Sequence, residues 1–243
     1  MAVSPETMAW LDWVSLTSVP LYRMDERQRP VGVASGCLVR LGPRRLLLSV
    51  SHATQEGSWV AEIGFDEAKD KTEVLYFGRQ WTARHLDPAG PMSEDLDFSF
   101  IEVAEDFDPV MQERDKKGVI IRVRPRHEFE TNLTDSPTAD EVYAFTGRVH
   151  PARIDDLNFI ADPTVYPGLK YDRTEGYYHV FKLPVAHPGH EAFQGCSGAP
   201  IVDRSRRVVA LVCSGDVNSN SITGIGVQQI SAAIHAHLGA AGA

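Results

Sequence analysis

Near the end of the chain lies the sequence Gly195-Cys196-Ser197-Gly198-Ala199-Pro200, followed by the apolar pair Ile201-Val202. Glycines on both sides of a serine allow a tight backbone conformation that residues with a Cβ rarely adopt. Such a turn can direct the backbone N–H groups of Gly195 and Ser197 toward one point beside the serine hydroxyl, forming an oxyanion hole. The alternative is a glycine-rich hairpin with an incidental serine, because both residue types are common in turns.

A serine hydroxyl is a weak nucleophile unless a base takes its proton, and His52 is the candidate base. It follows the strongly apolar stretch Leu46–Val50 and is flanked by the small residues Ser51 and Ala53. A histidine at the end of a strand, with small neighbours, can be partly exposed to a cleft. The alternative is a hydrogen-bonded core or rim histidine. The chain has 9 histidines, and only its context distinguishes His52.

The third candidate is an acid that would hold the imidazole in the right tautomer. Asp97 lies in the alternating stretch Leu96–Ile101, on the face opposite to that of the large apolar residues. An aspartate facing the protein interior needs a hydrogen-bond partner, and His52 can be that partner. The alternative interpretation is a solvated acid at the start of a strand, and Asp95 is the alternative acid.

Short β-rich segments separated by turn residues make up most of the chain. We expect strands at 31–41, 45–50, 58–65, 73–78, 98–103, 118–123, 142–148, 177–183, 199–202, 207–213 and 222–227. Ser4-Pro5 predicts the start of a short helix over about 5–15, and 228–238 has a helical pattern. The polar stretch 128–140 is the predicted linker. No helix separates successive strands, so the pattern favours an all-β fold, either two small barrels or a large sandwich.

Charge and composition exclude several classes of protein. The chain has 24 Lys+Arg against 33 Asp+Glu, a net charge of −9, which argues against nucleic-acid binding. The basic clusters at 40–45 and 122–126 are interpreted as solvated faces. Residues 1–20 lack the features of a secretory signal, and no run approaches the roughly 20 apolar residues of a membrane span. Three cysteines are too few for a disulfide framework, so we expect a cytoplasmic protein without membrane contact.

The three segments, in the order His, Asp, Ser, resemble the chymotrypsin-like serine peptidases. The family has a small residue before its histidine, an aspartate that opens an apolar strand, and a Gly-x-Ser-Gly motif that ends in proline. Ser51-His52, Asp97–Phe100 and Gly195–Pro200 match these signatures in turn, and Ala34–Val39 resembles the small-residue strand before the histidine. The resemblance covers most of residues 31–228.

This resemblance implies two six-stranded antiparallel β-barrels with the site in the crevice between them. We expect a barrel in residues 1–130 that carries His52 and Asp97, and a second barrel in residues 131–243 that carries Ser197 and the final helix. The implied activity is that of a serine endopeptidase acting on a protein or peptide, with no cofactor. His52, Asp97 and Ser197 would be catalytic, and the N–H groups of Gly195 and Ser197 would form the oxyanion hole.

One departure concerns the residue before the nucleophile. Secreted animal members of the family place an aspartate there, where it pairs with a new N-terminus made by cleavage. This chain has Cys196 and no Ile-Val-Gly-Gly start, so we expect no activation by that route. The pattern is closer to bacterial or viral members, and Cys196 is expected to pack inward as a small apolar residue.

The resemblance also predicts a primary specificity pocket. Glu191, six residues before the nucleophile, would line its base, and a buried glutamate there would select Lys or Arg. The residues expected to form its backbone wall and its opposite side are Cys213, Ser214, Gly215, Gly224 and Gly226. His187, His190 and Glu191 together also suggest a metal site. Their spacing is not helical, and no further ligand cluster accompanies them, so no metal is expected.

Three alternatives to a freely active peptidase stay open. The chain could be an inactive peptidase-like scaffold that binds a protein partner. It could be an acyl transferase or esterase that uses the same three residues. It could also be a peptidase gated by a regulatory partner, because a constantly active cytoplasmic peptidase would be hazardous. The sequence does not indicate an oligomeric state.

Overall fold

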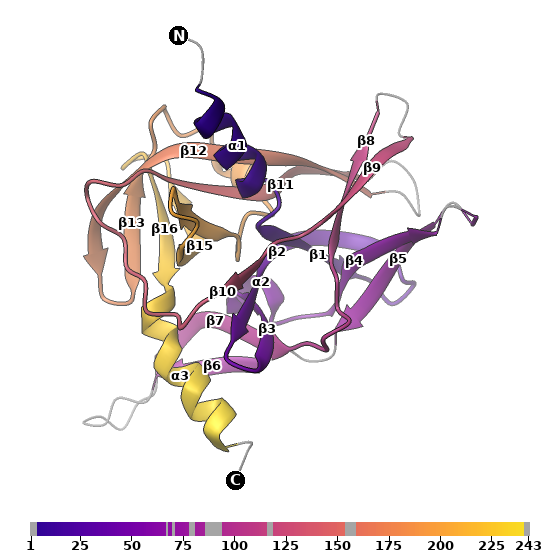
Figure 1. Cartoon of the computed structure of the whole chain (residues 1–243), viewed down its shortest axis with the longest axis horizontal. Helices are drawn as coiled ribbons and strands as arrows, with labels where there is room; N and C mark the ends of the chain where they lie inside the picture. The colour runs from indigo at the N-terminus through magenta and orange to yellow at the C-terminus, as the bar shows by residue number, and fades with distance from the viewer. Residues whose placement is uncertain are drawn as a thin grey trace.

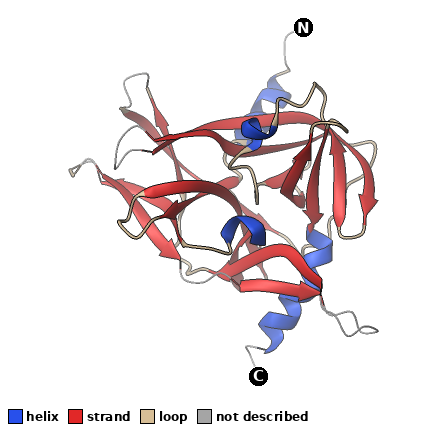
Figure 2. Ribbon diagram, turned by 180° about the vertical axis from the view of Figure 1, so that it is seen from behind, coloured by secondary structure: helices blue, strands red, loops and turns tan. Residues whose placement is uncertain are grey.

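A large β-sheet, a closed β-barrel and a separate hairpin lie between a helix near each end of the chain (Figure 1). The computed structural model describes residues 4–66, 68–69, 71–77, 81–85, 94–115, 119–153 and 159–240. Helix α1 (Pro5–Val14) begins after Ser4, whose hydroxyl accepts a hydrogen bond from Thr7 N–H, and helix α3 (Val227–Ala240) ends the described chain. None of the described helices is long and apolar enough to cross a membrane. Helices α1 and α3 lie at opposite sides of the molecule (Figure 2).

The first sheet has the strand order β5-β4-β1-β2-β3-β7-β6, and β10 pairs with β2. Its strands are β1 (Ser18–Met24), β2 (Pro30–Leu41), β3 (Arg44–Ser49), β4 (Ser58–Asp66), β5 (Lys71–Phe77), β6 (Trp81–His85), β7 (Glu94–Glu102) and β10 (Glu128–Glu130). The short helix α2 (Ser51–Thr54) follows β3, and β8 (Val110–Arg114) and β9 (Ile120–Pro125) form a separate hairpin. Along β3, Leu46 and Leu48 join one core cluster and Leu47 joins another, because successive side chains point to opposite faces.

The remaining strands form a closed antiparallel barrel with the order β11-β12-β13-β16-β15-β14. They are β11 (Tyr143–Arg153), β12 (Phe159–Glu175), β13 (Tyr178–Lys182), β14 (Pro200–Asp203), β15 (Val208–Asp216) and β16 (Ser221–Gly226). The resemblance to the chymotrypsin-like peptidases implies two barrels, and the described residues form one closed barrel. The first sheet is open across its described strands.

The stretch 128–140, the predicted linker, connects the first sheet to the barrel and is partly bound to the first sheet. Glu128–Glu130 runs parallel to β2, with Phe129 opposite Val39. The Glu128 carboxylate forms ion pairs with Arg40 and with the buried Arg45. Leu133 is fully buried. These contacts fasten the connection between the two sheets to the first sheet.

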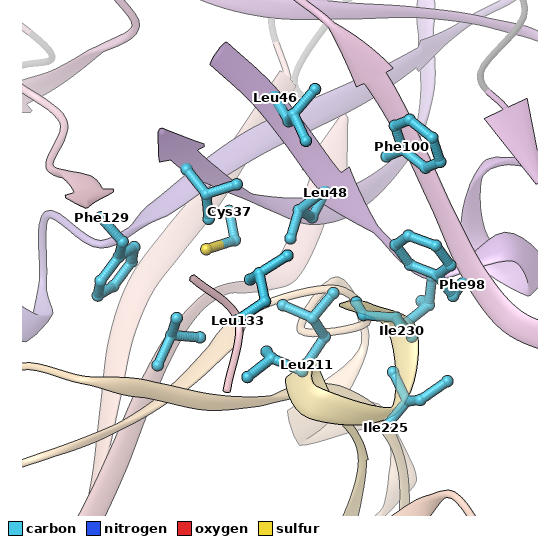
Figure 3. Packing of buried hydrophobic residues seen from close by; sticks show 14 of the residues in the cluster. Cys37, Leu46, Leu48, Phe98, Phe100, Phe129, Leu133, Leu211, Ile225 and Ile230 are labelled. Carbon is cyan, nitrogen blue, oxygen red and sulfur yellow. The ribbon is translucent and has the colours of Figure 1, made fainter. Parts of the chain in front are cut away.

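One hydrophobic cluster joins the first sheet, the barrel and α3 (Figure 3). Cys37 and Leu48 reach it from the first sheet, Leu211 and Ile225 from the barrel, and Ile230 from α3. The two sheets are therefore held against each other by a shared core. Residues that come from both sheets can meet at a fixed site between them.

Candidate active site

The loop that carries Ser197 has a backbone that only glycine fits. Gly195 has a φ of +94° and Gly198 has a φ of +87°, both in the left-handed region that favours glycine. A Cβ at Gly195 would lie 2.1 Å from the Arg148 carbonyl oxygen, and a Cβ at Gly198 would lie 2.1 Å from the Ser35 carbonyl oxygen. The two glycines of the motif are thus required both by conformation and by close backbone approach.

Hydrogen bonds from both sheets hold this loop in place. Ser35 on β2 donates from its N–H to the Ser197 carbonyl at 2.8 Å and from its hydroxyl to the Gly195 carbonyl at 2.8 Å. From the other side, the Gly198 N–H donates to the carbonyl of Val212 on β15 at 2.8 Å. The anchoring role of Ser35 is not predicted from the sequence, where it is one small residue of the strand before the histidine.

His52, Asp97 and Ser197 meet between the two sheets. His52 lies in α2, directly after β3, and its Nδ1 is 2.7 Å from Asp97 Oδ2. Its Nε2 is 3.1 Å from Ser197 Oγ. An ionised carboxylate can only accept hydrogen bonds, so Nδ1 carries the proton and the Nε2 lone pair faces the serine hydroxyl. Asp95, the alternative acid, also belongs to β7, but its side chain is outside the described part of the chain.

Asp97 also accepts hydrogen bonds from groups other than the His52 imidazole. Its Oδ1 accepts hydrogen bonds from the His52 backbone N–H at 3.0 Å and from the Ser51 hydroxyl at 3.1 Å. Burial raises the pKa of this carboxyl, but the hydrogen bonds from His52 and Ser51 outweigh burial, so the pKa lies below its usual range. Asp97 is therefore ionised at neutral pH.

Cys213 is a neighbour of this carboxylate that the sequence does not predict. Burial and the negative charge of Asp97 raise the pKa of the Cys213 thiol well above its usual range. The thiol is therefore protonated beside the carboxylate. The sequence assigns Cys213 only to a backbone wall, because nothing in its strand pattern shows that it faces Asp97.

The backbone N–H groups of the serine loop differ in whether a described residue accepts a hydrogen bond from them. The N–H groups of Cys196 and Ala199 donate to the carbonyls of Phe193 and Cys196 at 3.0 and 2.9 Å. Within the described part of the chain, no acceptor is bonded to the N–H of Gly195 or Ser197. These two donors are free to bind an oxygen of another molecule.

Cys196 points away from this loop into the protein, as the sequence predicts. Its side chain is fully buried in the barrel core, and burial raises the pKa of its thiol to about 12. A Cβ at Gly147 would lie 2.5 Å from its sulfur. Cys196 therefore packs as a small apolar residue.

The residues predicted to form the primary pocket are arranged differently from the prediction. Glu191 lies in the 3-10 helix η1 (His190–Phe193) and is exposed, so it is not a buried base for a pocket. Ser214 is also exposed, at the end of β15. Gly224 and Gly226 do not leave open space, because Cβ atoms there would lie 2.8 Å from the Leu211 carbonyl and 2.5 Å from His179 Nε2.

The side of Gly215 is occupied as well. A Cβ at this residue would lie 2.5 Å from His187 Nε2. The metal site considered for His187, His190 and Glu191 has no support in the structure, since the described residues contain no group of three or more His, Cys, Asp or Glu that could hold an ion.

No protein-family model and no curated protein sequence matches this chain. Solved structures do match it. The serine endoprotease from Yersinia pestis superposes with a TM-score of 0.54 over 97% of this chain and 67% of its own, at 10% identity. The Rv3671c protease of M. tuberculosis, in its inactive form, superposes with a TM-score of 0.50 over 98% of both chains, at 13% identity. The chain therefore has the fold of the chymotrypsin-like serine peptidases.

Proposed function

We propose that this protein is a serine endopeptidase that hydrolyses peptide bonds at Ser197. The observation that supports this most directly is the continuous series of contacts from Asp97 through His52 to Ser197, at 2.7 and 3.1 Å. These three side chains come from different elements, and Ser197 belongs to a loop in which two backbone N–H groups, those of Gly195 and Ser197, have no acceptor among the described residues. Acyl transfer through a serine needs these parts: a nucleophile, a base, an orienting acid and an oxyanion hole.

In the proposed reaction, Ser197 Oγ attacks the substrate carbonyl carbon while His52 Nε2 takes the hydroxyl proton. Asp97 holds the ring and stabilises the imidazolium that forms. The N–H groups of Gly195 and Ser197 stabilise the oxyanion, commonly by about 3 kcal/mol per donor. His52 then gives its proton to the leaving amine, and the C–N bond breaks. Water, deprotonated by His52, then attacks the acyl carbon. The C–O bond to Ser197 breaks, the acyl group leaves as a carboxylic acid, and His52 returns the proton to Ser197 Oγ. No step needs a metal or cofactor.

We also infer two finer properties. The open first sheet is the counterpart of the first barrel of the chymotrypsin-like fold, because it supplies His52 and Asp97 from the side facing the closed barrel. The protein acts in a reducing compartment such as the cytoplasm, since Cys37, Cys196 and Cys213 are free and buried.

The experiment is labelling with a fluorophosphonate probe, which reacts only with an activated serine. The wild type is expected to be labelled, and Ser197→Ala and His52→Ala are expected to lose labelling while keeping a native circular dichroism spectrum. Ser205→Ala, an exposed serine in the turn before β15, is the matched control and should be labelled like the wild type. A folded wild type that is never labelled would contradict the proposal and favour the inactive scaffold.

Hydrolysis is tested separately from the reactivity of the serine. The wild type should cleave peptides from a library, and Ser197→Ala should not. Turnover of esters without turnover of any peptide would contradict the endopeptidase assignment and favour an esterase or acyl transferase.

A further inference from the structure

A small pocket lies between the first sheet and the barrel. It has room for about one particle the size of a water molecule. None of the described residues that line it carries a carboxylate. The residues that line it include Ser18 of β1, Arg126 between β9 and β10, Thr146, Gly147 and Arg148 of β11, and Pro163 of β12.

Arg126 brings a buried positive charge to this pocket. Its side chain is only 8% exposed. Its Nε and Nη1 donate to the carbonyls of Val110 and Ser15 at 3.3 and 3.0 Å. Its Nη2 is also buried, but no described residue accepts a hydrogen bond from it. A buried charged donor without an acceptor is costly, so a group that binds Nη2 would stabilise the folded protein.

Ser18 supplies a second donor from a different element. It is only 3% exposed, and its hydroxyl has no hydrogen-bond partner among the described residues. The hydroxyl of Thr146, by contrast, already donates to the Thr164 carbonyl at 3.1 Å. Ser18 and Arg126 line the same pocket, so one small acceptor in it would lie near both donors.

The charges around Arg126 favour an anion over a water molecule. Burial and the positive charge of Arg148 lower the pKa of Arg126 to about 9, although Glu62 and Tyr22 act in the opposite direction. Two arginines against one glutamate leave an excess of positive charge. Water could accept a hydrogen bond from Nη2, but only an anion would also offset this charge.

We propose that the pocket is a binding site for a monatomic anion of the size of chloride, held by Arg126 and Ser18. Phosphate and sulfate are too large for a space of this size. The ion reaches the pocket from the side of Pro163, which is exposed. This inference concerns a site other than Ser197 and does not depend on peptide hydrolysis.

The bound ion would join the two sheets behind the serine loop. It links β1 of the first sheet to β11 of the barrel. The same part of β11 supports the serine loop, because a Cβ at Gly195 would lie 2.1 Å from the Arg148 carbonyl oxygen and a Cβ at Gly147 would lie 2.5 Å from Cys196 Sγ. Occupancy should therefore stabilise the whole protein, because the two sheets share one core.

The test measures the melting temperature as chloride replaces gluconate, an anion too large for the pocket, at constant ionic strength. From about 5 to about 300 mM chloride, the melting temperature of the wild type should rise by about 3 °C or more. Arg126→Gln, which removes the charge, should shift by less than about 1 °C, and Ser18→Ala should lose about half of the shift. Arg122→Gln is the matched control, because Arg122 is an exposed arginine of β9 outside the pocket, and it should shift like the wild type.

A crystal of the wild type soaked in sodium bromide locates the ion without any substitution. Its anomalous signal should place bromide within about 3.5 Å of Arg126 Nη2. A wild type whose melting temperature does not respond to chloride would overturn the inference. Equal shifts in the wild type, Arg126→Gln and Ser18→Ala would also overturn it, as would an occupied pocket without an anomalous signal. If the two pocket variants do not fold, the bromide position decides.

Discussion

At the scale of single residues, Asp97 shows how the site fixes one protonation state. Its two oxygens accept from the His52 ring, the His52 backbone and the Ser51 hydroxyl. An amide at this position could keep the contacts to Oδ1 but would place an NH₂ group against His52 Nδ1. The ring would then carry its proton on Nε2, which faces Ser197, and could no longer act as a base.

Asp97→Asn should therefore slow fluorophosphonate labelling by about 10³–10⁴-fold, the scale seen when the acid of such a triad is made neutral. Its melting temperature should stay close to that of the wild type above pH 7. Asp106→Asn, which changes an exposed aspartate in a turn, should be labelled at the wild-type rate. Labelling of Asp97→Asn at an undiminished rate would show that Asp97 does not orient the base.

Gly198→Ala tests the close approach of the two sheets. The new methyl group would lie 2.1 Å from the Ser35 carbonyl oxygen and 2.4 Å from the Ser49 hydroxyl, at a φ of +87°. We expect a loss of at least about 2 kcal/mol in the free energy of unfolding, and a melting temperature lower by about 4 °C or more.

Gly42→Ala is the matched control for this change. Gly42 also has a positive φ, +58°, but a Cβ there meets nothing within 4 Å, so only backbone strain is added. The difference between the losses of melting temperature in the two variants measures the contribution of the steric clash at Gly198. Equal losses would mean that the serine loop does not depend on its contact with β2.

At the scale of elements, the sequence predicts the two terminal helices and most of the strands, but not β1, β6, β8, β10 or β12. Pro20 in β1, and Pro163 and Pro167 in β12, are typical of turns and remove a backbone donor. These prolines are tolerated because the part of the strand that contains them pairs with a neighbouring strand on one side only. The second neighbour of β1 is β4, which pairs only at Tyr22–Met24, and the second neighbour of β12 is β13, which pairs only at Lys170–Glu175. Strand pairing between distant segments therefore overrides the local signal.

For the candidate site, the sequence predicts which three side chains come together, because each is marked by its immediate neighbours. Their catalytic roles stay predictions. The pocket is predicted less well, since the conformation of residues 184–194 has no periodic pattern. The exposure of Glu191 and the position of His187 depend on how this loop packs against β15, and that contact is not encoded locally.

Trp10 is one of the side chains that hold helix α1 against the barrel. Trp10 is buried, and its Nε1–H donates to the Asp203 carbonyl at 2.9 Å, across 193 residues of sequence. Trp10→Ala should lower the free energy of unfolding by about 3–5 kcal/mol. Met8→Ala, on the exposed side of the same helix, should change it by less than about 0.5 kcal/mol. Denaturant unfolding followed by fluorescence measures the free energy of unfolding of both variants. Equal values for the two would mean that the packing of Trp10 does not stabilise the protein.

At the scale of the whole molecule, buried histidines make stability depend on pH. His179 is almost fully buried inside the barrel, its Nδ1 is 2.8 Å from the Thr174 hydroxyl, and burial lowers its pKa below the usual 6.5. The unfolded chain therefore binds a proton at a higher pH than the folded chain does. Stability is unaffected by this group above pH 6.5 and falls as the pH drops below that value.

The melting temperature of the wild type should accordingly fall when the pH is lowered from 7.5 to 5.5. His179→Gln should lose less over the same interval, whatever its stability at pH 7.5. His235→Gln, at an exposed position on α3, is the control and should follow the wild-type curve. A His179→Gln curve parallel to that of the wild type would show that this histidine does not control acid stability.

Ser35 belongs to the first sheet, yet its amide and hydroxyl fix the two carbonyls on either side of Cys196 in the serine loop. The strand that carries Ser35 also pairs with Glu128–Glu130, the segment that leads into the barrel. A ligand that shifted this strand by a fraction of an ångström would displace Ser197, the proposed nucleophile, without touching it. An inhibitor of the proposed peptidase therefore need not resemble a peptide.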